Sequence, residues 1–580
     1  MLGPPPPADA VGLGIAGVSS AAFAASFGFN YGVGNQVTYL IPALRRLDPG
    51  LFTRDWFATR TTQYHPVFTE LGASLLRLDR GGWAVALAFT VAVTAAGLSL
   101  YLLCRKLVGR GALATFLLLL ALLLATQTRG PALTYVFDRE LQPSTLSSAC
   151  LIGAALAFTA GRGFASSVLI AAGGLVHINF ALLCAPALLI AELLLGRREL
   201  ARRLVVQLAL PVLAVLAFLP TLRAAAAPSP DADLGRHVYL AIRAPHHFQL
   251  VSKLIEFLPL LAWHALALAA LLPLARRPSG EPFVRLAALA AGLSVVVWGG
   301  TFAGLASERA AALFAWRLAP HTELLFQVLC LAAAVRALLV PSVARLYTPR
   351  ARSFVLAGLV AVVSAYVVRH ERVPVEVLGA TALVALVWDA VARRARSEDA
   401  PLALRSLWAR HAPALLAVGV GVVCIYFAIG PLTRIRQRSS LLAVAPREAR
   451  GLFAFMRERT PRQALFLTPP DDDSLRFFGE RAIVVDWKGN PAVPREVLDW
   501  YRRIEDVTGR RGMTHAAELE GYDELDAERL EALRARYGFD YAVVRRGREG
   551  ALPGYERAFE NAAYVVLKVG APDQATRDAL

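Results

Sequence analysis

Residues 30–80 read NYGVGNQVTYLIPALRRLDPGLFTRDWFATRTTQYHPVFTELGASLLRLDR, and they form the one long polar segment enclosed by strongly apolar ones. Two pieces of it, Val37 to Leu47 and Pro66 to Leu78, repeat apolar residues at helical spacing. Both are too polar to cross a bilayer and have the pattern of helices that lie on a membrane interface. We expect this stretch to carry the chemistry and the rest of the chain to hold it at a membrane surface.

The composition of the chain is that of a polytopic membrane protein. Its 580 residues are 56% hydrophobic, and the mean hydropathy is +0.49, which is far too apolar for a soluble protein of this length. The net charge of +17 lies in the apolar part, because the residues from Leu441 onward hold 22 Lys/Arg and 24 Asp/Glu. Basic residues in short loops orient membrane helices, so we expect no nucleic-acid partner.

Apolar runs long enough to cross about 30 Å of hydrocarbon recur along the chain. They lie near residues 12–28, 82–104, 112–127, 146–161, 203–222, 254–275, 284–305, 321–340, 353–369, 374–392 and 411–432. Residues 165–195 are too long for one helix, have basic residues at both ends and are interrupted at His177. We interpret them as a hairpin of two short helices, which makes about 13 spans in a mainly α bundle.

Basic clusters mark alternate connections between these spans and predict the orientation of the chain. They are Arg105, Lys106 and Arg110; Arg162; Arg197 to Arg203; Arg276, Arg277 and Arg285; Arg345 to Arg352; and Arg393 to Arg410. The positive-inside rule assigns these connections and the N-terminus to the cytoplasm. The opposite, outer face then holds residues 29–81, 128–145, 223–253, 306–320 and all residues after Pro431. Arg434, Arg436 and Arg438 on that face run against the rule.

The composition divides the chain into a transmembrane domain at residues 1–438 and a C-terminal domain at residues 439–580. Past Arg438 the sequence is charged and mixed, with strand patterns at 464–470, 482–487, 541–546 and 562–569. Amphipathic helix patterns alternate with them at 446–460, 493–507 and 526–538. This alternation predicts a small α/β domain with a partly parallel sheet on the outer face.

Two carboxylates of the first outer loop, Asp55 and Asp48, are the candidate catalytic residues. A carboxylate beside aromatic residues at a membrane surface suits a general base for an acceptor hydroxyl, or a ligand of a divalent cation that bridges phosphates. A structural role is the alternative for both. Asp48 precedes Pro49 at a turn, and Asp55 has Arg54 and Arg60 as possible ion-pair partners.

A second set of outer-face residues has the chemistry of a phosphate site, because clustered arginines and histidines hold phosphate through charge-assisted hydrogen bonds. The candidate substrate-binding residues are His65, Arg139, Glu140, His177, Arg243, His246, His247 and Arg317. Ordinary packing of the histidines and headgroup anchoring by the arginines are the alternatives. A zinc site is not expected, because the adjacent His246 and His247 point apart and all five cysteines lie in apolar segments; the cofactor is left open, with a divalent cation at the loop carboxylates as the candidate.

The short first span, the long outer loop with two interfacial helices, the many further spans and the outer α/β domain together resemble the GT-C superfamily of polytopic glycosyltransferases. The segments NQVTYLIPALRRLDPGLFTRDWF, HHF and VVDWKGNP are also similar to those of bacterial membrane proteins with GT-C-like topology. In that superfamily an acidic residue of the first outer loop is the base, commonly in a pair just after the first span. Here that place reads NYGVGNQ, so Asp55 or Asp48 would serve from further along the loop.

The resemblance implies a glycosyltransferase of the bacterial inner membrane that takes a sugar from a polyprenyl-phosphate donor at the outer face. Membrane lipid, the donor and an unidentified acceptor would be its partners, with the C-terminal domain in the periplasm. A non-catalytic transporter or lipid-handling protein that binds an anionic substrate in the same basic cavity is the alternative function.

Overall fold

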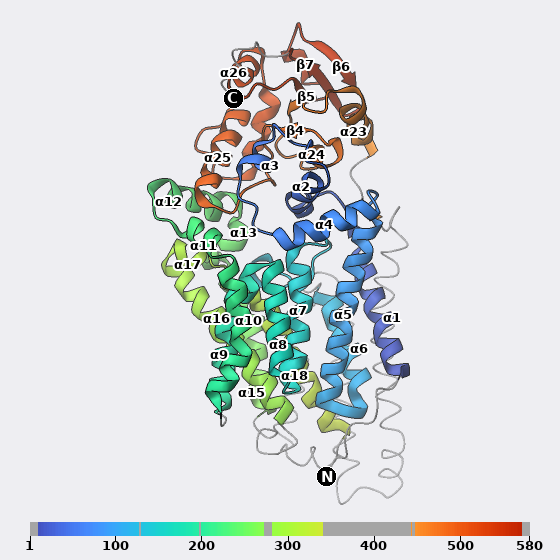
Figure 1. The fold of residues 1–580 in the computed structure, drawn as a ribbon, viewed down its shortest axis with the longest axis vertical. Helices are drawn as coiled ribbons and strands as arrows, with labels where there is room; N and C mark the ends of the chain where they lie inside the picture. The colour runs from blue at the N-terminus through green and yellow to red at the C-terminus, as the bar shows by residue number, and fades with distance from the viewer. Residues whose placement is uncertain are drawn as a thin grey trace, which may run out of the picture.

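The computed structural model describes residues 10–126, 129–196, 199–271, 281–339, 442–443 and 447–570. Three expected spans, near 353–369, 374–392 and 411–432, and the expected domain boundary at residue 438 lie outside these ranges. In the described part, a bundle of long helices carries a layer of short helices at one end, and a domain with a β-sheet lies on that layer (Figure 1).

Each of the ten expected spans within the described ranges contains a helix. These helices are α1 (Ala10–Phe27), α5 (Trp83–Val108), α6 (Ala112–Thr126), α7 (Pro143–Thr159), α8 (Gly163–Val176), α9 (Ile178–Leu195), α10 (Leu200–Ala217), α15 (Leu258–Leu271), α16 (Glu281–Ala306) and α18 (Ala319–Leu339). Seven segments of the described chain are long and apolar enough to cross a membrane. The predicted hairpin is also present, since α8 and α9 meet at His177. The chain is therefore a multi-pass membrane protein.

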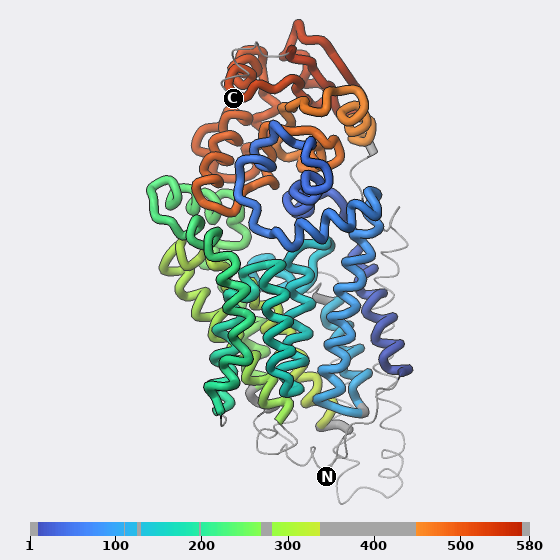
Figure 2. The backbone as a smooth tube through the Cα atoms, viewed as in Figure 1, coloured from blue at the N-terminus to red at the C-terminus, as the bar shows by residue number. Residues whose placement is uncertain are grey.

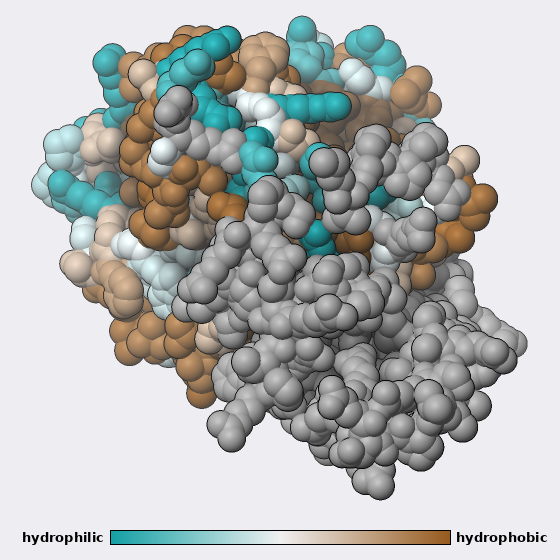
Figure 3. Space-filling model, turned by 90° about the horizontal axis from the view of Figure 1, so that it is seen from below, coloured by the Kyte–Doolittle hydropathy of each residue, from teal (hydrophilic) through white to brown (hydrophobic). Residues whose placement is uncertain are grey.

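The outer flanks of the bundle are apolar, as a surface that faces lipid must be. On α10, Val205, Val212 and Leu213 are exposed, and Figure 3, which views the molecule from below, shows apolar side chains gathered toward the edges of the described part. Inside the bundle, small residues allow close packing. A Cβ at Gly292 of α16 would lie 2.2 Å from the carbonyl oxygen of Ala187 on α9, so these two backbones meet only because residue 292 is glycine.

The first outer loop forms α2 (Asn35–Leu47), α3 (Trp56–Arg60) and α4 (Pro66–Leu78), so the two predicted amphipathic helices are confirmed. α2 packs on α4, where a Cβ at Gly72 would lie 3.1 Å from that of Ala43. The loop lies between the bundle and the C-terminal domain (Figure 2). The apolar face of α2 is therefore buried in protein.

The C-terminal domain contains the predicted partly parallel sheet, in the strand order β4-β3-β5-β7-β6. β3 pairs in parallel with β4 and β5, whereas β7 pairs antiparallel with β5 and β6. Its elements are α23 (Arg447–Arg459), β3 (Leu465–Leu467), α24 (Ser474–Gly479), β4 (Ala482–Ile483), α25 (Pro494–Thr508), α26 (Ala527–Tyr537), β5 (Tyr541–Arg545), β6 (Glu556–Glu560) and β7 (Tyr564–Lys568). The edge strand β6 and the one-turn helix α24 were not predicted.

Strand pairing joins the start of the first loop to the chain that enters the C-terminal domain. β1 (Phe29–Asn30) pairs in parallel with β2 (Leu442–Ala443). Polar contacts continue this junction further along the loop. Arg54 pairs with Asp540 at 2.6 Å, and Arg80 pairs with Glu480 at 2.8 Å. The first loop and the C-terminal domain are therefore on the same side of the bundle.

Short helices from other outer connections complete the layer between the bundle and the C-terminal domain. They include α11 (Leu219–Ala226), α12 (Pro230–His237), the π-helix η3 (Val238–Arg243), α13 (Pro245–Phe248), α17 (Glu308–Ala311) and the 3₁₀ helix η6 (Ala315–Leu318). α12 lies against the start of α25, where a Cβ at Gly235 would lie only 1.8 Å from the carbonyl oxygen of Pro494.

The fold predicts which exposed residues share a side of the membrane. Cysteines introduced at Glu70 on α4 and at Arg502 on α25 should react alike with a membrane-impermeant thiol reagent in intact cells. Arg162 lies at the far end of the bundle, so a cysteine there should be labelled only if the first two are not, and should stay unlabelled if they are labelled. Labelling of the first two positions from different sides would contradict the docking of the C-terminal domain on the first loop.

Candidate functional site

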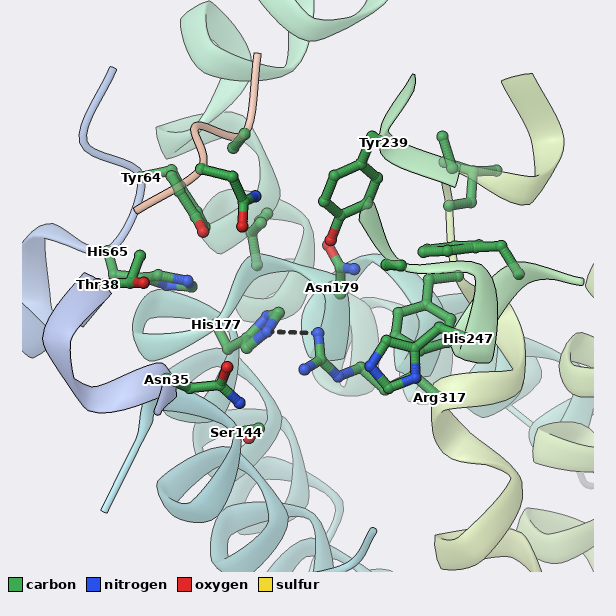
Figure 4. A pocket seen from close by; sticks show the side chains of 18 of the residues that line it. Asn35, Thr38, Tyr64, His65, Ser144, His177, Asn179, Tyr239, His247 and Arg317 are labelled. Carbon is green, nitrogen blue, oxygen red and sulfur yellow. Dashed lines mark hydrogen bonds between the residues drawn. The ribbon is translucent and has the colours of Figure 1, made fainter. Parts of the chain in front are cut away.

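A pocket of about 650 Å³ lies where one end of the helix bundle, the first loop and the C-terminal domain meet. In Figure 4, Asn35, Thr38, Tyr64 and His65 lie on one side of it and Tyr239, His247 and Arg317 on the other. Its polar lining residues include Asn35, Thr38, Tyr39, Tyr64, His65, Asp138, His177, Asn179, Tyr239, Arg243, His246, His247, Arg317, Lys488 and Asn490. Each of the three parts of the fold contributes to this list.

Six of the eight predicted substrate-binding residues line this one pocket, although they come from distant parts of the sequence. They are His65, His177, Arg243, His246, His247 and Arg317. The other two are close in sequence to the lining residue Asp138. Arg139 is exposed, and Glu140 is buried. The two predicted catalytic carboxylates, Asp48 and Asp55, are not among the lining residues.

Asp55 lies in a buried ion pair between the first loop and the C-terminal domain. Its side chain caps α3 by accepting from the backbone N–H of Ala58 at 3.0 Å. The other carboxylate oxygen lies 3.0 Å from Nε of Arg476 and accepts from the N–H of Ile483. Arg476 also pairs with Asp486 at 3.3 Å, and all three charged side chains are at most 1% exposed. The contacts of Asp55 are therefore those of an N-cap and of an interdomain ion pair.

Asp48 is at the surface, where it accepts from the N–H of Gly50 in the turn that precedes α3. It also pairs with Arg462 of the C-terminal domain. Its side chain is 37% exposed. This geometry matches the turn-forming alternative for Asp48 and adds a second interdomain contact.

Three cations face the pocket without an ion pair to any carboxylate of the described chain: Arg243, Arg317 and Lys488. The guanidinium of Arg243 lies 5.4 Å above the ring of Trp487, and burial lowers its pKa. Arg317 donates to Nε2 of His177 at 2.8 Å. Burial, with Arg243 nearby, lowers the pKa of Lys488. Such desolvated cations favour an anionic ligand, because an opposite charge offsets the cost of burying them.

The pocket histidines are held as neutral rings. Nδ1 of His65 donates to the carbonyl of Val176 at 2.9 Å, and Nδ1 of His247 donates to that of Ala132 at 2.8 Å. Burial lowers the pKa of each of these rings to about 3. Burial and the neighbouring Arg317 place the pKa of His177 well below its usual value. At neutral pH these rings orient groups through hydrogen bonds and do not add positive charge.

The carboxylate that lines the pocket is Asp138. Two further carboxyl groups, Glu140 and Asp473, are not among the lining residues. Burial raises the pKa of Glu140 to about 8, with Asp138 adding to the shift, and burial raises that of Asp473 to about 6. Gly34, at φ 63°, separates the two. Its N–H donates to Asp473 at 2.9 Å, and a Cβ there would lie 2.7 Å from Oε1 of Glu140.

Within the described ranges, no group of three or more His, Cys, Asp or Glu side chains is placed to hold a metal ion.

Several lining residues were not predicted as site residues. Lys488 and Asn490 belong to the segment VVDWKGNP. The only sign of a site in that segment was the pair of polar residues between Trp487 and Pro491. Tyr39 lies within α2, Tyr64 lies in the coil between α3 and α4, and Tyr239 lies in η3; none of these tyrosines has a pattern of its own. Their convergence depends on the contact between the first loop and the C-terminal domain, which is not readable from local sequence.

The buried pair predicts that Asp55→Asn destabilises the protein. Removing one partner of a buried charge pair costs on the order of 3 kcal/mol, so the apparent Tm in detergent should fall clearly. Asp48→Asn removes a surface pair and should cost less than about 1 kcal/mol. Equal stability of the two variants would contradict the structural role of Asp55.

The raised pKa of Glu140 predicts a dependence of stability on pH. The folded chain keeps this carboxyl protonated up to about pH 8, whereas the unfolded chain loses the proton near its ordinary value. Stability from this group is therefore fully present at low pH and is lost as the pH rises toward 8.

Glu140→Gln should remove this loss of stability with rising pH. The difference between the Tm of the variant and that of wild type should therefore shift in favour of the variant between pH 5 and pH 8.5. The exposed Glu70→Gln serves as the control and should follow the wild-type profile. Parallel profiles of wild type and Glu140→Gln would show that Glu140 titrates normally.

Comparison with solved structures gives a match over nearly the whole chain. ArnT from Cupriavidus metallidurans, solved bound to undecaprenyl phosphate, matches with a TM-score of 0.52 and 14% identity, over 97% of this chain and 100% of that one. The Archaeoglobus fulgidus oligosaccharyltransferase, in its apo form, matches with a TM-score of 0.45 and 13% identity, over 92% of this chain and 69% of that one.

Comparisons at the level of sequence add little. Residues 447–507 match the family described as a domain of unknown function (DUF6798), and no curated protein matches the chain. The likeness to ArnT, together with the helix bundle, the first loop and the sheet domain described above, shows that this membrane protein has a GT-C-like fold.

Proposed function

We propose that this protein is a glycosyltransferase of the GT-C type that takes its sugar from a polyprenyl-phosphate donor bound in the pocket. The supporting observation is that Arg243 and Arg317 face the pocket without a carboxylate partner in the described chain. A phosphate would supply the missing negative charge to both guanidinium groups. The likeness to ArnT, which was solved with undecaprenyl phosphate, supports a lipid-linked phosphate as that ligand.

The shape of the lining also suits such a donor. Besides its cations, the pocket is lined by apolar residues at the outer ends of the helices, among them Ile178, Leu222 and Leu313. Leu222 belongs to α11, a helix with no buried residue, so this side of the pocket borders the surface of the molecule next to the membrane helices. A polyprenyl chain entering there would leave its phosphate at Arg243 and Arg317.

In the reaction we propose, an acceptor hydroxyl oxygen attacks the anomeric carbon of the donor sugar. The bond from that carbon to the phosphate oxygen breaks, and the phosphate leaves with the electron pair. Arg243 and Arg317 stabilise the negative charge that develops on it. We assign the role of base, which takes the proton of the acceptor hydroxyl, to Asp138 and not to Asp55 or Asp48, because Asp138 is the carboxylate that lines the pocket.

The membrane side follows from charge. Because the basic connections alternate, we place the pocket and the C-terminal domain on the periplasmic face of a bacterial inner membrane. The nearly neutral C-terminal domain gives no reason to expect nucleic acid as a partner. The acceptor is a hydroxyl compound that reaches the pocket from that face.

The test is transfer of labelled sugar from polyprenyl-phosphate donors by the purified protein, with binding of undecaprenyl phosphate measured alongside. Asp138→Asn should lower kcat by roughly 10²-fold or more and leave binding in place. Arg243→Gln and Arg317→Gln should each weaken binding by roughly 10- to 100-fold. Arg46→Gln, on the exposed face of α2, is the charge-matched control and should change neither quantity.

The outcomes separate the proposal from its alternative. A wild-type protein that binds undecaprenyl phosphate but transfers no sugar to any acceptor supplied would support the lipid-handling function. Full transfer by Asp138→Asn would remove Asp138 as the base. Binding of undecaprenyl phosphate that neither arginine variant weakens would overturn the proposed site.

A further inference from the structure

One loop of the C-terminal domain enters the pocket. This loop comprises residues 486–492, and four of them line the pocket: Lys488, Asn490, Pro491 and Ala492. The rest of the lining comes from the transmembrane helices and their outer connections, with the first loop among them. The C-terminal domain is therefore part of the pocket wall, and Lys488 is the cation that it contributes.

Hydrogen bonds fix the backbone of this loop at several points. The indole N–H of Trp500 donates to the carbonyl of Asp486 at 2.8 Å, and the hydroxyl of Thr38 on α2 donates to that of Lys488 at 2.9 Å. The N–H of Trp487 donates to the carbonyl of Pro470 at 2.7 Å. The position of Lys488 is thus set from both the C-terminal domain and the first loop.

The buried ion pairs reach the same loop. Arg476, paired with Asp55 of the first loop, also pairs with Asp486, whose carboxylate accepts from the N–H of Gly489. A Cβ at Gly489 would lie 2.5 Å from Nη1 of Arg476 and 2.6 Å from Oδ1 of Asp486. Because both of those side chains are fully buried, they have no room to move aside, and the loop keeps this path only with glycine at 489.

The loop also supports a second cation. The ring of Trp487 lies under the guanidinium of Arg243 at 5.4 Å, a distance at which a cation and an aromatic face attract. The residue beside it, Lys488, has no ion pair to a described carboxylate. One short loop therefore sets the positions of two of the three unpaired cations that face the pocket.

We propose that Lys488 binds the same phosphate as Arg243 and Arg317, and that the Asp55–Arg476–Asp486 ion pairs and Gly489 are positioning elements that hold Lys488 there. This inference rests on the proposed function and extends it: the phosphate site is shared between the membrane domain and the C-terminal domain. Its ligand is a phosphate monoester or diester of a lipid. Lys488 provides a point charge, whereas the two arginines provide planar pairs of donors.

The experiment measures binding of undecaprenyl phosphate to the full-length protein in detergent, with undecaprenol as the uncharged lipid. Lys488→Met should raise the Kd for undecaprenyl phosphate by roughly 10- to 100-fold and leave that for undecaprenol unchanged. Lys488→Arg keeps the charge and should recover most of the loss. Lys568→Met, an exposed lysine on β7 of the same domain, is the matched control and should bind as wild type does.

The positioning role is tested by a double-mutant cycle. Gly489→Ala should displace the loop and weaken binding of undecaprenyl phosphate about as much as Lys488→Met does. The double variant Lys488→Met/Gly489→Ala should then be no weaker than either single variant, because both remove the same contact. If Gly489→Ala does not fold, Thr38→Val, which removes the hydrogen bond to the carbonyl of Lys488, takes its place in the cycle.

The results distinguish this inference from the proposed function. Wild-type affinity in Lys488→Met, with affinity lost in Arg243→Gln, would overturn the role of Lys488 and leave the proposed site intact. Unchanged affinity in both variants would overturn the proposed site itself. Additive losses in the double-mutant cycle would show that Gly489 acts on stability and not through Lys488.

Discussion

The architecture depends on one buried arginine. Arg476 holds Asp55 of the first loop and Asp486 of the C-terminal domain, and none of the three side chains is more than 1% exposed. Burying such charges is costly, and apolar packing often gives equal or better stability, so ion pairs of this kind fix one arrangement more than they strengthen it. Here the arrangement is the position of the C-terminal domain on the first loop, and that position brings Lys488, Asn490, Pro491 and Ala492 to the pocket wall.

The membrane architecture and most of the sheet domain were predictable from sequence, because hydropathy and periodicity are local signals. α2 and α4 follow from apolar spacing, and the hairpin at His177 follows from the basic residues around it. The edge strand β6 was not predictable from its sequence, ERAFE, whose side chains are mostly exposed and charged. Helix α24 is a single turn and too short to show a period.

The site was predictable in part. Six residues chosen for phosphate chemistry line one pocket. The expectation for Asp55 followed from its place in the first loop, but its contacts are set by Arg476, and no local pattern reveals that partner. Charge in the pocket also differs from the expectation, because burial keeps His65 and His247 neutral, and Arg243, Arg317 and Lys488 are its cations without an ion pair in the described chain.

The pairing of Asp55 with Arg476 has a consequence for synthesis. The two residues are 421 positions apart, and a ribosome adds about 5–20 residues per second. Synthesis of Arg476 therefore follows that of Asp55 by roughly 20 to 80 s. During that time the first loop exists without the segment that completes its buried ion pair. A chain released before Arg476 would also lack Lys488, Asn490, Pro491 and Ala492 of the pocket wall, so the last quarter of translation supplies both the ion pair and part of the pocket.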